Sequence, residues 1–468
     1  MYNKTRKKGK NMKREMPTFS IYTLGCKVNQ EEGAALAALF TAAGYRQVSF
    51  SDAADIYIIN TCTVTHVADK KCRSMIRRAV KANAQALIIV TGCYAQVATE
   101  KVAAIDGVDL IVGVNERADL LSLVEKYWQD KQPIRAVGDI SRAKKYLSIG
   151  NGLSQQERAR AYLKVEDGCD QFCNYCLVPY ARGPVRSLPI DEAVQQASLL
   201  LAQGHREIVL SGIHIGAYGQ DLPGANLFLL IDNLLQLPGD WRLRLSSIEP
   251  QQLDDKLLDL LAKNKKICPH LHIPLQSGSD KILLAMGRKY DTRKYAALLH
   301  KLRAINPFIA ITSDIMVGYP VETEQDFAES YDFCRAMKFA GLHIFPYSRR
   351  QGTPAAQLCN QVQPNIKERR VASLSALAQE MATLYGQSFI GKELFLLLEQ
   401  KAAINGRDYW YGHSENYLPL YLPYKNGQRG EIVKVVVEKP LGYEKNRKNK
   451  KEGFFSRLAG NANLEDEY

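Results

Sequence analysis

The fold of the middle of the chain is decided by residues 162–186, which read Tyr-Leu-Lys-Val-Glu-Asp-Gly-Cys-Asp-Gln-Phe-Cys-Asn-Tyr-Cys-Leu-Val-Pro-Tyr-Ala-Arg-Gly-Pro-Val-Arg. Cys169, Cys173 and Cys176 follow a short apolar run with C-x3-C-x2-C spacing. Three thiolates bind three irons of a four-iron cluster and leave the fourth iron open. A structural zinc site, the alternative, needs four ligands, and the next cysteine or histidine is His205. The spacing therefore favours an iron–sulfur cluster after a strand.

Strand and helix patterns alternate through residues 155–385, and the cysteine loop follows the first strand. Six such βα units in about 225 residues indicate an open, partial (β/α)6 barrel, because a closed eight-unit barrel needs about 250 residues. The expected strands are 162–165, 207–210, 243–245, 271–273, 309–315 and 343–345, and the expected helices are 190–203, 225–237, 252–263, 292–304, 323–338 and 364–385.

Residues 17–130 show the same alternation and are expected to form a separate α/β domain around a parallel sheet. A polar stretch of little periodicity, residues 131–160, is expected to be a linker. The expected strands of the domain are 19–24, 56–59, 87–90 and 110–112, and its expected helices are 30–44, 64–82 and 95–104.

Three cysteines of this domain each follow a predicted strand. Cys26 lies in Thr-Leu-Gly-Cys-Lys-Val-Asn, Cys62 in Ile-Asn-Thr-Cys-Thr-Val-Thr, and Cys93 in Val-Thr-Gly-Cys-Tyr-Ala. Because parallel strands bring their carboxyl ends to one sheet edge, where ligands bind, we predict a second three-cysteine site there. Buried cysteines acting as small apolar residues are the alternative, but those would be expected inside the strands. Cys72, in a predicted helix, is the less favoured ligand.

The last part of the chain, residues 386–440, loses the alternation and is expected to form a small β-barrel. The charged chain ends, residues 1–16 and 441–468, are expected to be flexible tails. The expected strands are 393–398, 416–422 and 431–437. The module also mixes aromatic with basic or polar side chains, which suits the stacking of unpaired RNA bases. These side chains are Arg407, Tyr409, Trp410, Tyr411, His413 and Tyr417.

Composition adds a preference for a polyanionic partner. The chain has 468 residues, with 62 Lys and Arg against 49 Asp and Glu, a formal net charge of +13. No signal peptide and no apolar run of about 20 residues is present, so a cytoplasmic protein is expected, with no membrane contact. The ten cysteines then indicate metal ligands or free thiols. A phosphate-contacting face and a plain solvated face are both open for the helical stretch with Lys70, Lys71, Arg73, Arg77, Arg78 and Lys81.

The loop of Cys169, Cys173 and Cys176, with Tyr175 before the last cysteine, resembles the radical S-adenosylmethionine (SAM) superfamily. The resemblance implies a partial barrel and a [4Fe–4S] cluster on these cysteines. It also implies that SAM binds the open iron and is cleaved there to a 5′-deoxyadenosyl radical.

Both cysteine sets together resemble the methylthiotransferase family, over residues 17–437. The resemblance implies a second [4Fe–4S] cluster, on Cys26, Cys62 and Cys93, that holds or relays sulfur. It implies two uses of SAM, tRNA as partner, and an RNA-binding TRAM domain at residues 386–440. An electron donor such as flavodoxin or ferredoxin is also implied, whereas the oligomeric state is left open. Further matching stretches are 60–65, 180–184, 275–279 and 345–350.

The stretch Thr23-Leu-Gly-Cys-Lys-Val-Asn-Gln30 resembles the branch that converts N6-threonylcarbamoyladenosine, next to the anticodon of tRNA, to its 2-methylthio derivative. The alternatives are the branch for N6-isopentenyladenosine in tRNA and the branch for a ribosomal protein aspartate. Glu31, Val321 and Gln351 depart from the family's usual Tyr, Gly and Pro. Val321 puts a local turn in question, because a β-branched residue tolerates positive φ poorly.

Polar residues near the expected carboxyl ends of the barrel strands are candidates for SAM binding, since barrel active sites form there. For each of them, a loop residue hydrogen-bonded to the backbone is the alternative. The candidates are Ser211, His214, Glu249, Gln276, Asp314 and Tyr347.

Overall fold

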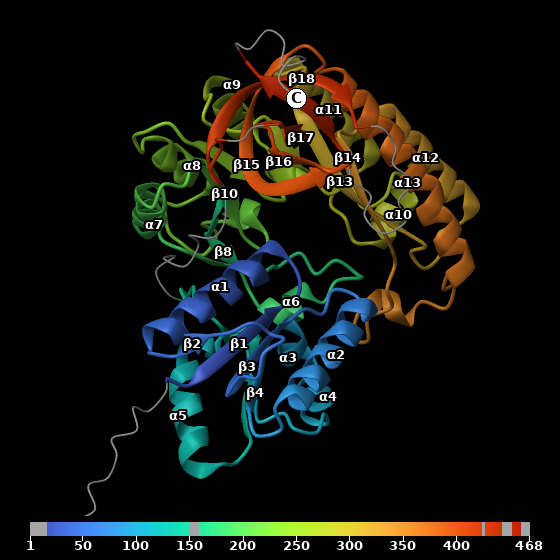
Figure 1. Ribbon diagram of the computed structural model, residues 1–468. Helices are drawn as coiled ribbons and strands as arrows, with labels where there is room; N and C mark the ends of the chain where they lie inside the picture. Colours follow the sequence, from blue (N-terminus) through green and yellow to red (C-terminus); the bar gives the residue numbers. More distant parts are fainter. Residues whose placement is uncertain (1–15, 150–158, 424–425, 442–451, 460–468) are drawn as a thin grey trace, which may run out of the picture.

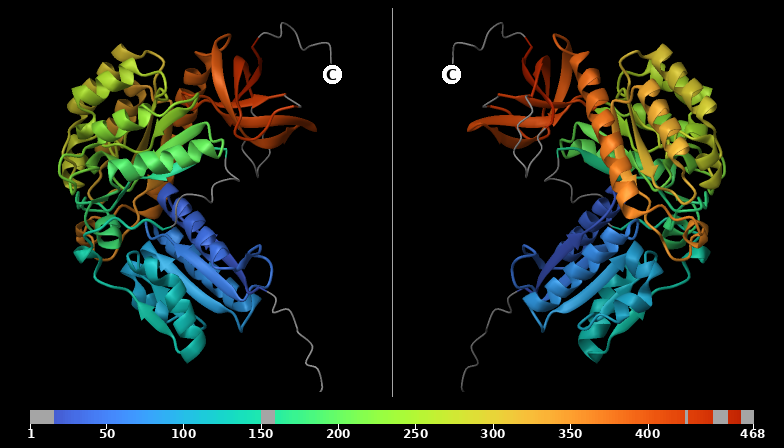
Figure 2. Two further views of the ribbon diagram at one scale, coloured as in Figure 1. Left: turned by 90° about the vertical axis from the view of Figure 1, so that its left-hand side faces the viewer. Right: turned by 90° about the vertical axis from the view of Figure 1, so that its right-hand side faces the viewer.

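The computed structural model describes residues 16–149, 159–423, 426–441 and 452–459. An N-terminal α/β domain is followed by an open barrel of parallel strands and then by a small closed barrel (Figure 1). Side views place the N-terminal domain below the open barrel and the small barrel beside it (Figure 2). The predicted α/β fold class with these three parts is confirmed.

The N-terminal domain is built on a parallel sheet with strand order β2-β1-β3-β4-β5-β6. Its strands are β1 (Thr18–Thr23), β2 (Arg46–Gln47), β3 (Ile56–Thr61), β4 (Leu87–Gly92), β5 (Leu110–Val112) and β6 (Ile134–Ala136). Its helices are α1 (Lys27–Ala42), α2 (His66–Ala82), α3 (Cys93–Val97), α4 (Thr99–Ala103) and α5 (Leu120–Asp130). α1 and α5 pack on one face of the sheet, and α2 and α3 pack on the other. The central strands β3 and β4 are therefore buried on both faces, which explains their continuous apolar runs.

Strand β6 corrects the predicted linker. Residues 134–136 pair with β5 in the parallel register, with Ile134 opposite Leu110. The strand is only three residues long and lies half-buried at the edge of the sheet, so no apolar run marks it in the sequence.

The middle part is an open barrel of parallel strands in the order β7-β10-β11-β12-β13-β14. Its two halves meet at isolated bridges between Leu243 and Ile267 and between Ser247 and His272. This confirms the predicted partial barrel. The strands are β7 (Ala161–Lys164), β10 (Glu207–Ser211), β11 (Arg242–Leu245), β12 (His270–His272), β13 (Ala310–Val317) and β14 (Gly341–Pro346). The helices that cover them are α7 (Ile190–Ala202), α8 (Leu227–Leu235), α9 (Asp255–Lys263), α10 (Asp280–Ala285), α11 (Thr292–Ile305), α12 (Glu324–Met337) and α13 (Pro364–Gln387).

The C-terminal part is a closed barrel with strand order β15-β16-β17-β19-β18 around an apolar core. The strands are β15 (Glu393–Ile404), β16 (Arg407–His413), β17 (Pro419–Leu422), β18 (Ile432–Pro440) and β19 (Phe454–Leu458). β16 was not among the expected strands. β19 lies within the predicted tail 441–468, which is therefore wrong for residues 454–458. The other predicted tail residues 1–15, 442–451 and 460–468 lie outside the described residues.

Packing explains why β19 belongs to the barrel despite its charged neighbours in the sequence. Phe454 is buried in the barrel core, and β19 pairs with both β17 and β18. A Cβ on Gly386, near the end of α13, would lie 2.0 Å from the Phe454 ring, so only glycine allows this close approach. Over the described ranges, no helix is both long enough and apolar enough to cross a membrane.

Candidate functional site

The first cysteine set lies in the loop after β7. The short antiparallel strands β8 (Glu166–Asp167) and β9 (Arg186–Ser187) pair on either side of it. Gly168 has φ of +104°, and a Cβ there would lie 1.9 Å from the Pro184 carbonyl oxygen, so the turn into Cys169 requires glycine. The Cys169 amide donates to the Gly183 carbonyl at 3.0 Å, and the Cys176 amide donates to the Cys173 carbonyl at 2.9 Å. The loop is thus held by backbone contacts at both ends.

Cationic and aromatic side chains surround this loop. The Arg288 guanidinium donates to Cys173 Sγ at 3.4 Å and pairs with Glu249. Phe172, half-exposed and with φ of +45°, packs edge-on against Tyr180. Arg288 therefore offers positive charge directly beside a thiolate donor.

The second set lies at the carboxyl edge of the N-terminal sheet, as predicted from the strand ends. Cys26 precedes α1, Cys62 follows β3, and Cys93 begins α3 after β4. The turn before Cys26 packs directly on Cys62, since a Cβ on Gly25 would lie 3.1 Å from Cys62 Sγ. Burial raises the pKa of Cys26 and of Cys62. The charge of Cys93 raises both pKa values further, and the charge of Cys26 also raises that of Cys62. The three thiols therefore lie close enough to repel one another when ionised.

Cys72 does not lie at the carboxyl edge of the sheet with the other three cysteines. It is fully buried in the core between α2 and the sheet, and its thiol donates to the Cys62 carbonyl at 3.4 Å. That bond satisfies the thiol, so Cys72 behaves as a small core residue.

The donor sets fit clusters better than single ions. Tetrahedral zinc would bring its thiolate sulfurs to about 3.8 Å of one another, given Zn–S bonds of about 2.3 Å. In the described part of the chain, the only three potential ligands that lie mutually within 4.8 Å are His272, Asp314 and His343. A four-iron cluster binds each thiolate through a separate iron, which suits the wider spacing.

Burial keeps the free thiols neutral. Desolvation raises the pKa of Cys62, Cys169 and Cys176 to about 12 in each case. Thiolates would therefore form at these positions only when a metal centre binds them and displaces the protons.

A buried ionic network connects the two cysteine sets. Helix α6 (Val178–Arg182) follows Cys176 and contacts α3. At its end, the fully buried Arg182 donates Nε to Cys93 Sγ at 3.2 Å. The same guanidinium pairs with Glu32 at 2.6 Å and with Asp167 at 3.3 Å. Arg182 thus belongs to the first loop and contacts the second site.

Glu32 is the central anion of this network. Arg117 pairs with it at 2.6 Å and Lys164 at 2.7 Å. Burial alone would raise the pKa of Glu32, but Arg117, Arg182 and Lys164 together hold it well below its usual range. Sequence reasoning missed this network, because its members come from both domains and carry no local motif.

Five of the six predicted SAM contacts lie at the carboxyl ends of barrel strands or in the loops that follow them, as the strand positions imply. Ser211 donates to Glu31 Oε2 at 2.8 Å, and Glu249 pairs with Arg288. His214 bonds Gln252 at 3.0 Å through Nε2, whereas its buried Nδ1 has no partner among the described residues. The buried Oε1 of Gln276 is likewise without a described partner. These two orphaned atoms fit a polar ligand such as SAM.

Tyr347 is buried against Tyr319 in an aromatic cluster, with Lys367 over its ring. These contacts hold the Tyr347 ring in place. A role of Tyr347 in binding SAM stays a prediction.

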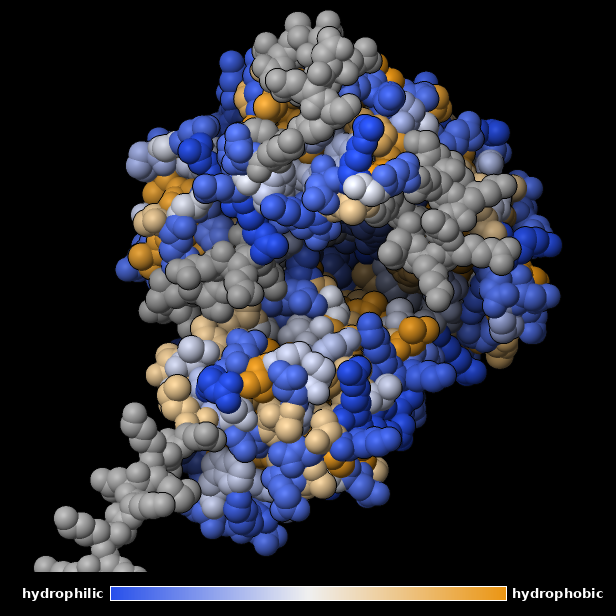
Figure 3. Space-filling model, in the orientation of Figure 1, coloured by the Kyte–Doolittle hydropathy of each residue, from blue (hydrophilic) through white to orange (hydrophobic). Residues whose placement is uncertain are grey.

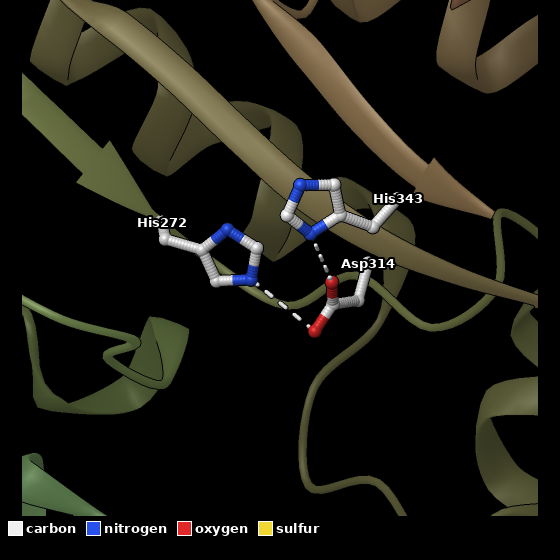
Figure 4. A group of neighbouring side chains, drawn as sticks. All are labelled: His272, Asp314 and His343. Atoms are coloured by element: carbon white, nitrogen blue, oxygen red, sulfur yellow. Dashed lines mark ion pairs between the residues drawn. The ribbon is translucent and has the colours of Figure 1, made fainter. Parts of the chain in front are cut away.

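Asp314, the sixth candidate, lies within β13 and is held by two histidines (Figure 4). Its Oδ2 pairs with His272 Nε2 at 3.2 Å, and its Oδ1 pairs with His343 Nδ1 at 3.3 Å. Despite burial, the histidines lower the pKa of Asp314, and Asp314 raises the pKa of His343. Both carboxylate oxygens are therefore engaged by the neighbouring strands.

The small barrel docks on the open barrel through a buried carboxylate, Glu207. Arg242 and Arg244 pair with Glu207 at 2.6 and 2.9 Å. The two guanidiniums also donate to backbone carbonyls of the small barrel, at 2.7 Å to Phe395 and at 3.0 Å to Glu415. The docking is thus fixed by charge-assisted bonds to backbone.

Docking also uses the aromatic groups expected to stack on RNA. Tyr417 lies between His270 and His413, with ring centroids 4.5 Å from each. Trp410 lies in the core of the small barrel. The predicted RNA platform is therefore wrong for Trp410 and Tyr417. Tyr409 contacts Phe455 and Tyr411 contacts Tyr421 at the barrel wall.

A cavity of about 460 Å³ lies where the three parts meet. Gly25 and Lys27 line it from the N-terminal domain, Arg160 from the open barrel and Glu399 from the small barrel. The face shown in Figure 3 is hollowed between the N-terminal domain and the small barrel, with hydrophilic residues inside the hollow and some hydrophobic residues along its lower rim. A larger cavity of about 660 Å³, near Trp241, contains none of the predicted site residues.

Known proteins match both cysteine-bearing parts. Residues 163–334 match the radical SAM superfamily, and residues 18–113 match the uncharacterized protein family UPF0004. The structure of the radical SAM methyltransferase TsrM from Kitasatospora setae, with cobalamin and a [4Fe–4S] cluster bound, has a similar fold. Its TM-score is 0.54 at 14% identity, covering 72% of this chain and 76% of that one. Fold and family match together define a radical SAM enzyme.

Two relatives indicate which kind of radical SAM enzyme the chain is. The chain is 41% identical over 445 residues to threonylcarbamoyladenosine tRNA methylthiotransferase MtaB of Bacillus subtilis (strain 168), covering 95% of this chain and 97% of that protein. It is 32% identical over 392 residues to tRNA-2-methylthio-N(6)-dimethylallyladenosine synthase of Carboxydothermus hydrogenoformans, covering 82% and 88%. The chain belongs to the tRNA methylthiotransferase family. Membership in this family implies SAM and [4Fe–4S] clusters as cofactors.

Proposed function

We propose that this chain replaces the C2 hydrogen of N6-threonylcarbamoyladenosine, next to the anticodon of tRNA, with a methylthio group. The observation that carries the proposal is the pair of three-cysteine sets joined by Arg182. One set lies in the barrel loop and the other at the sheet edge. A cavity large enough for a modified base borders the second set.

Cys169, Cys173 and Cys176 would hold the cluster that binds SAM, and Cys26, Cys62 and Cys93 would hold the second cluster. When bound, these groups supply one-electron cleavage of SAM and a place for sulfur, which acid–base side chains cannot provide for an unactivated C–H bond. The residues of the chain bind and orient the reactants. His214 and Gln276 offer free polar atoms for SAM, and the cavity where the three parts meet would hold the base between the domains.

The threonylcarbamoyl substrate is supported by the relatives. Proteins named as threonylcarbamoyladenosine methylthiotransferases are 35 to 41% identical to this chain. The proteins named for dimethylallyladenosine are 32 to 35% identical. The second candidate substrate is therefore N6-isopentenyladenosine, and the ribosomal protein aspartate is third.

The proposal includes partners and a location. A low-potential electron donor such as flavodoxin or ferredoxin would reduce the barrel cluster, and modification of tRNA would take place in the cytoplasm. The exposed cations Lys70, Lys71, Arg77 and Arg78 on α2 offer a surface for phosphates.

Mass spectrometry of tRNA nucleosides tests the proposal. Cells without the gene are expected to lose 2-methylthio-N6-threonylcarbamoyladenosine and to accumulate the unmodified precursor, and the wild-type gene should restore the mark. The Cys173→Ala gene should not restore it. Loss of the methylthio mark from isopentenyladenosine instead would transfer the proposal to the second substrate, and unchanged tRNA in both respects would contradict it.

A further inference from the structure

Lys27 is a cation at the edge of the interdomain cavity whose charge no neighbouring side chain neutralises. It is the first residue of α1, is exposed, and lines the cavity together with Gly25. Among the described residues, no carboxylate forms an ion pair with it. A cation in the first turn of a helix is also unfavourable, because the helix dipole is positive there. A bound anion would therefore be stabilised at this position, both by the Lys27 ammonium and by the helix dipole.

The carboxylates in its surroundings are already engaged. Lys27 lies within the electrostatic influence of Glu207 and Asp314. Glu207 is paired with Arg160 at 3.3 Å, in addition to its two bonds with Arg242 and Arg244. Both oxygens of Asp314 pair with His272 and His343 (Figure 4).

Further positive charge reinforces the preference for an anion. Arg160 and Arg244 lie near enough to repel the Lys27 ammonium, and Arg160 lines the same cavity. The carboxylate that lines this cavity, Glu399, is paired with Arg160 and with His413, the latter at 2.7 Å. No described carboxylate of this wall is left to neutralise Lys27.

We infer that Lys27 binds the carboxylate of the amino-acid substituent on the target adenosine, and thereby selects this substrate over one with an apolar substituent. This inference rests on the proposed function. The threonylcarbamoyl group ends in a carboxylate, whereas an isopentenyl group is neutral and offers no charge to pair with the Lys27 ammonium.

The position of Lys27 along the chain fits this role. Gly25 and Lys27 both line the cavity and flank Cys26, and adjacent Cα atoms are about 3.8 Å apart. A base whose C2 faces the site of Cys26 would therefore present its N6 substituent within the reach of a lysine side chain. RNA phosphate is the other source of an anion, and the experiment separates the two.

The experiment uses reconstituted full-length enzyme and two anticodon stem-loop RNAs. One RNA carries N6-threonylcarbamoyladenosine and the other its methyl ester, which keeps every phosphate but lacks the carboxylate. The wild type is expected to prefer the acid by about 100-fold in kcat/KM. Lys27→Met should lower kcat/KM for the acid to the level of the ester and leave the ester unchanged, whereas Lys27→Arg should keep most of the preference. Lys126→Met on α5 is the matched loss of a surface lysine and should change neither.

Binding provides a second readout. Without reductant, fluorescence anisotropy should show a Kd for the acid RNA that rises by a similar factor in Lys27→Met, at unchanged iron content. Equal use of acid and ester by the wild type would overturn the inference alone. An equal loss on both RNAs in Lys27→Met would do the same, since it would indicate a phosphate contact or a structural role. A wild type that modifies neither RNA would overturn both the inference and the proposed function.

Discussion

The two cysteine sites differ in how the chain builds them. Cys169, Cys173 and Cys176 come from one loop, held by its own backbone bonds and by the pairing of β8 with β9. Cys26, Cys62 and Cys93 come from three separate strand ends, and their geometry depends on the whole sheet.

The difference teaches where each site depends on the rest of the molecule. The loop needs mainly its glycine turn and Arg288. The sheet-edge site receives Arg182 from the barrel, so its electrostatic environment is complete only when the two domains are docked. Damage to the interface should therefore affect the second site more than the first.

The largest expected effect separates the chemistry of the two sites. Cys173→Ala should abolish reductive cleavage of SAM, because the loop then offers only two thiolates. Cys62→Ala should retain SAM cleavage but form no methylthio product, because only the sheet-edge site is lost. Chromatography of 5′-deoxyadenosine and of the RNA nucleosides measures both. Equal loss of SAM cleavage in the two variants would argue against separate roles.

The next effect concerns the two arginines. Arg182→Met should destabilise the protein by about 3 kcal/mol, because it leaves buried Glu32 and Asp167 short of a cation. Arg288→Met removes one partner of Glu249, which is partly exposed, and should cost about 1 kcal/mol. Urea denaturation of the two proteins without iron provides the comparison. A larger loss of stability in Arg288→Met than in Arg182→Met would contradict the claim that the buried network between the domains contributes more to stability than the ion pair at the cysteine loop.

The cysteine sites could be predicted from the sequence, whereas the buried network between the domains could not. Strands and helices followed from local periodicity, and the cysteines could be placed because each lies just past a strand end. Arg182, Glu32 and Lys164 could not be recognised, because their pairing depends on how two domains meet. β19 was missed for a related reason, since its short apolar stretch gains its strand partners only in the closed barrel.

Two buried acids, one on each side of the interface, predict a pH dependence of stability. Desolvation raises the pKa of Glu166 in β8 to about 8 and that of Glu31 in α1 to about 7, from an ordinary value of 4.5. The folded state therefore favours the neutral acids. This stabilisation is complete below pH 4.5 and is lost as the pH rises through 7 to 8.

Glutamine variants remove this titration. Glu166→Gln should reduce the loss of stability between pH 5 and pH 9 by about 4 kcal/mol, and Glu31→Gln by about 3 kcal/mol. Urea midpoints at several pH values provide the test. An unchanged pH profile in both variants would show that neither acid titrates in this range.

The smallest effect is expected at the turn of Val321, which packs on the same apolar cluster as Tyr175 of the cysteine loop. Val321 has φ of +71°, so the turn strain expected from its β-branched side chain is present. Left-handed backbone costs such a residue about 1–3 kcal/mol, whereas glycine loses some packing and about 1 kcal/mol of backbone entropy. Val321→Gly should therefore raise stability by less than about 1 kcal/mol in thermal unfolding. A lower midpoint would mean that the packing of Val321 outweighs the strain, and iron content should not change in either case.

The most direct test of the account is the iron and sulfide content after anaerobic reconstitution of three proteins. The wild type should bind about eight irons, as two four-iron clusters. Replacing Cys26, Cys62 and Cys93 by alanine should leave about four, and so should replacing Cys169, Cys173 and Cys176. About four irons in the wild type, or about eight in the first triple variant, would contradict the presence of two separate clusters on these cysteines.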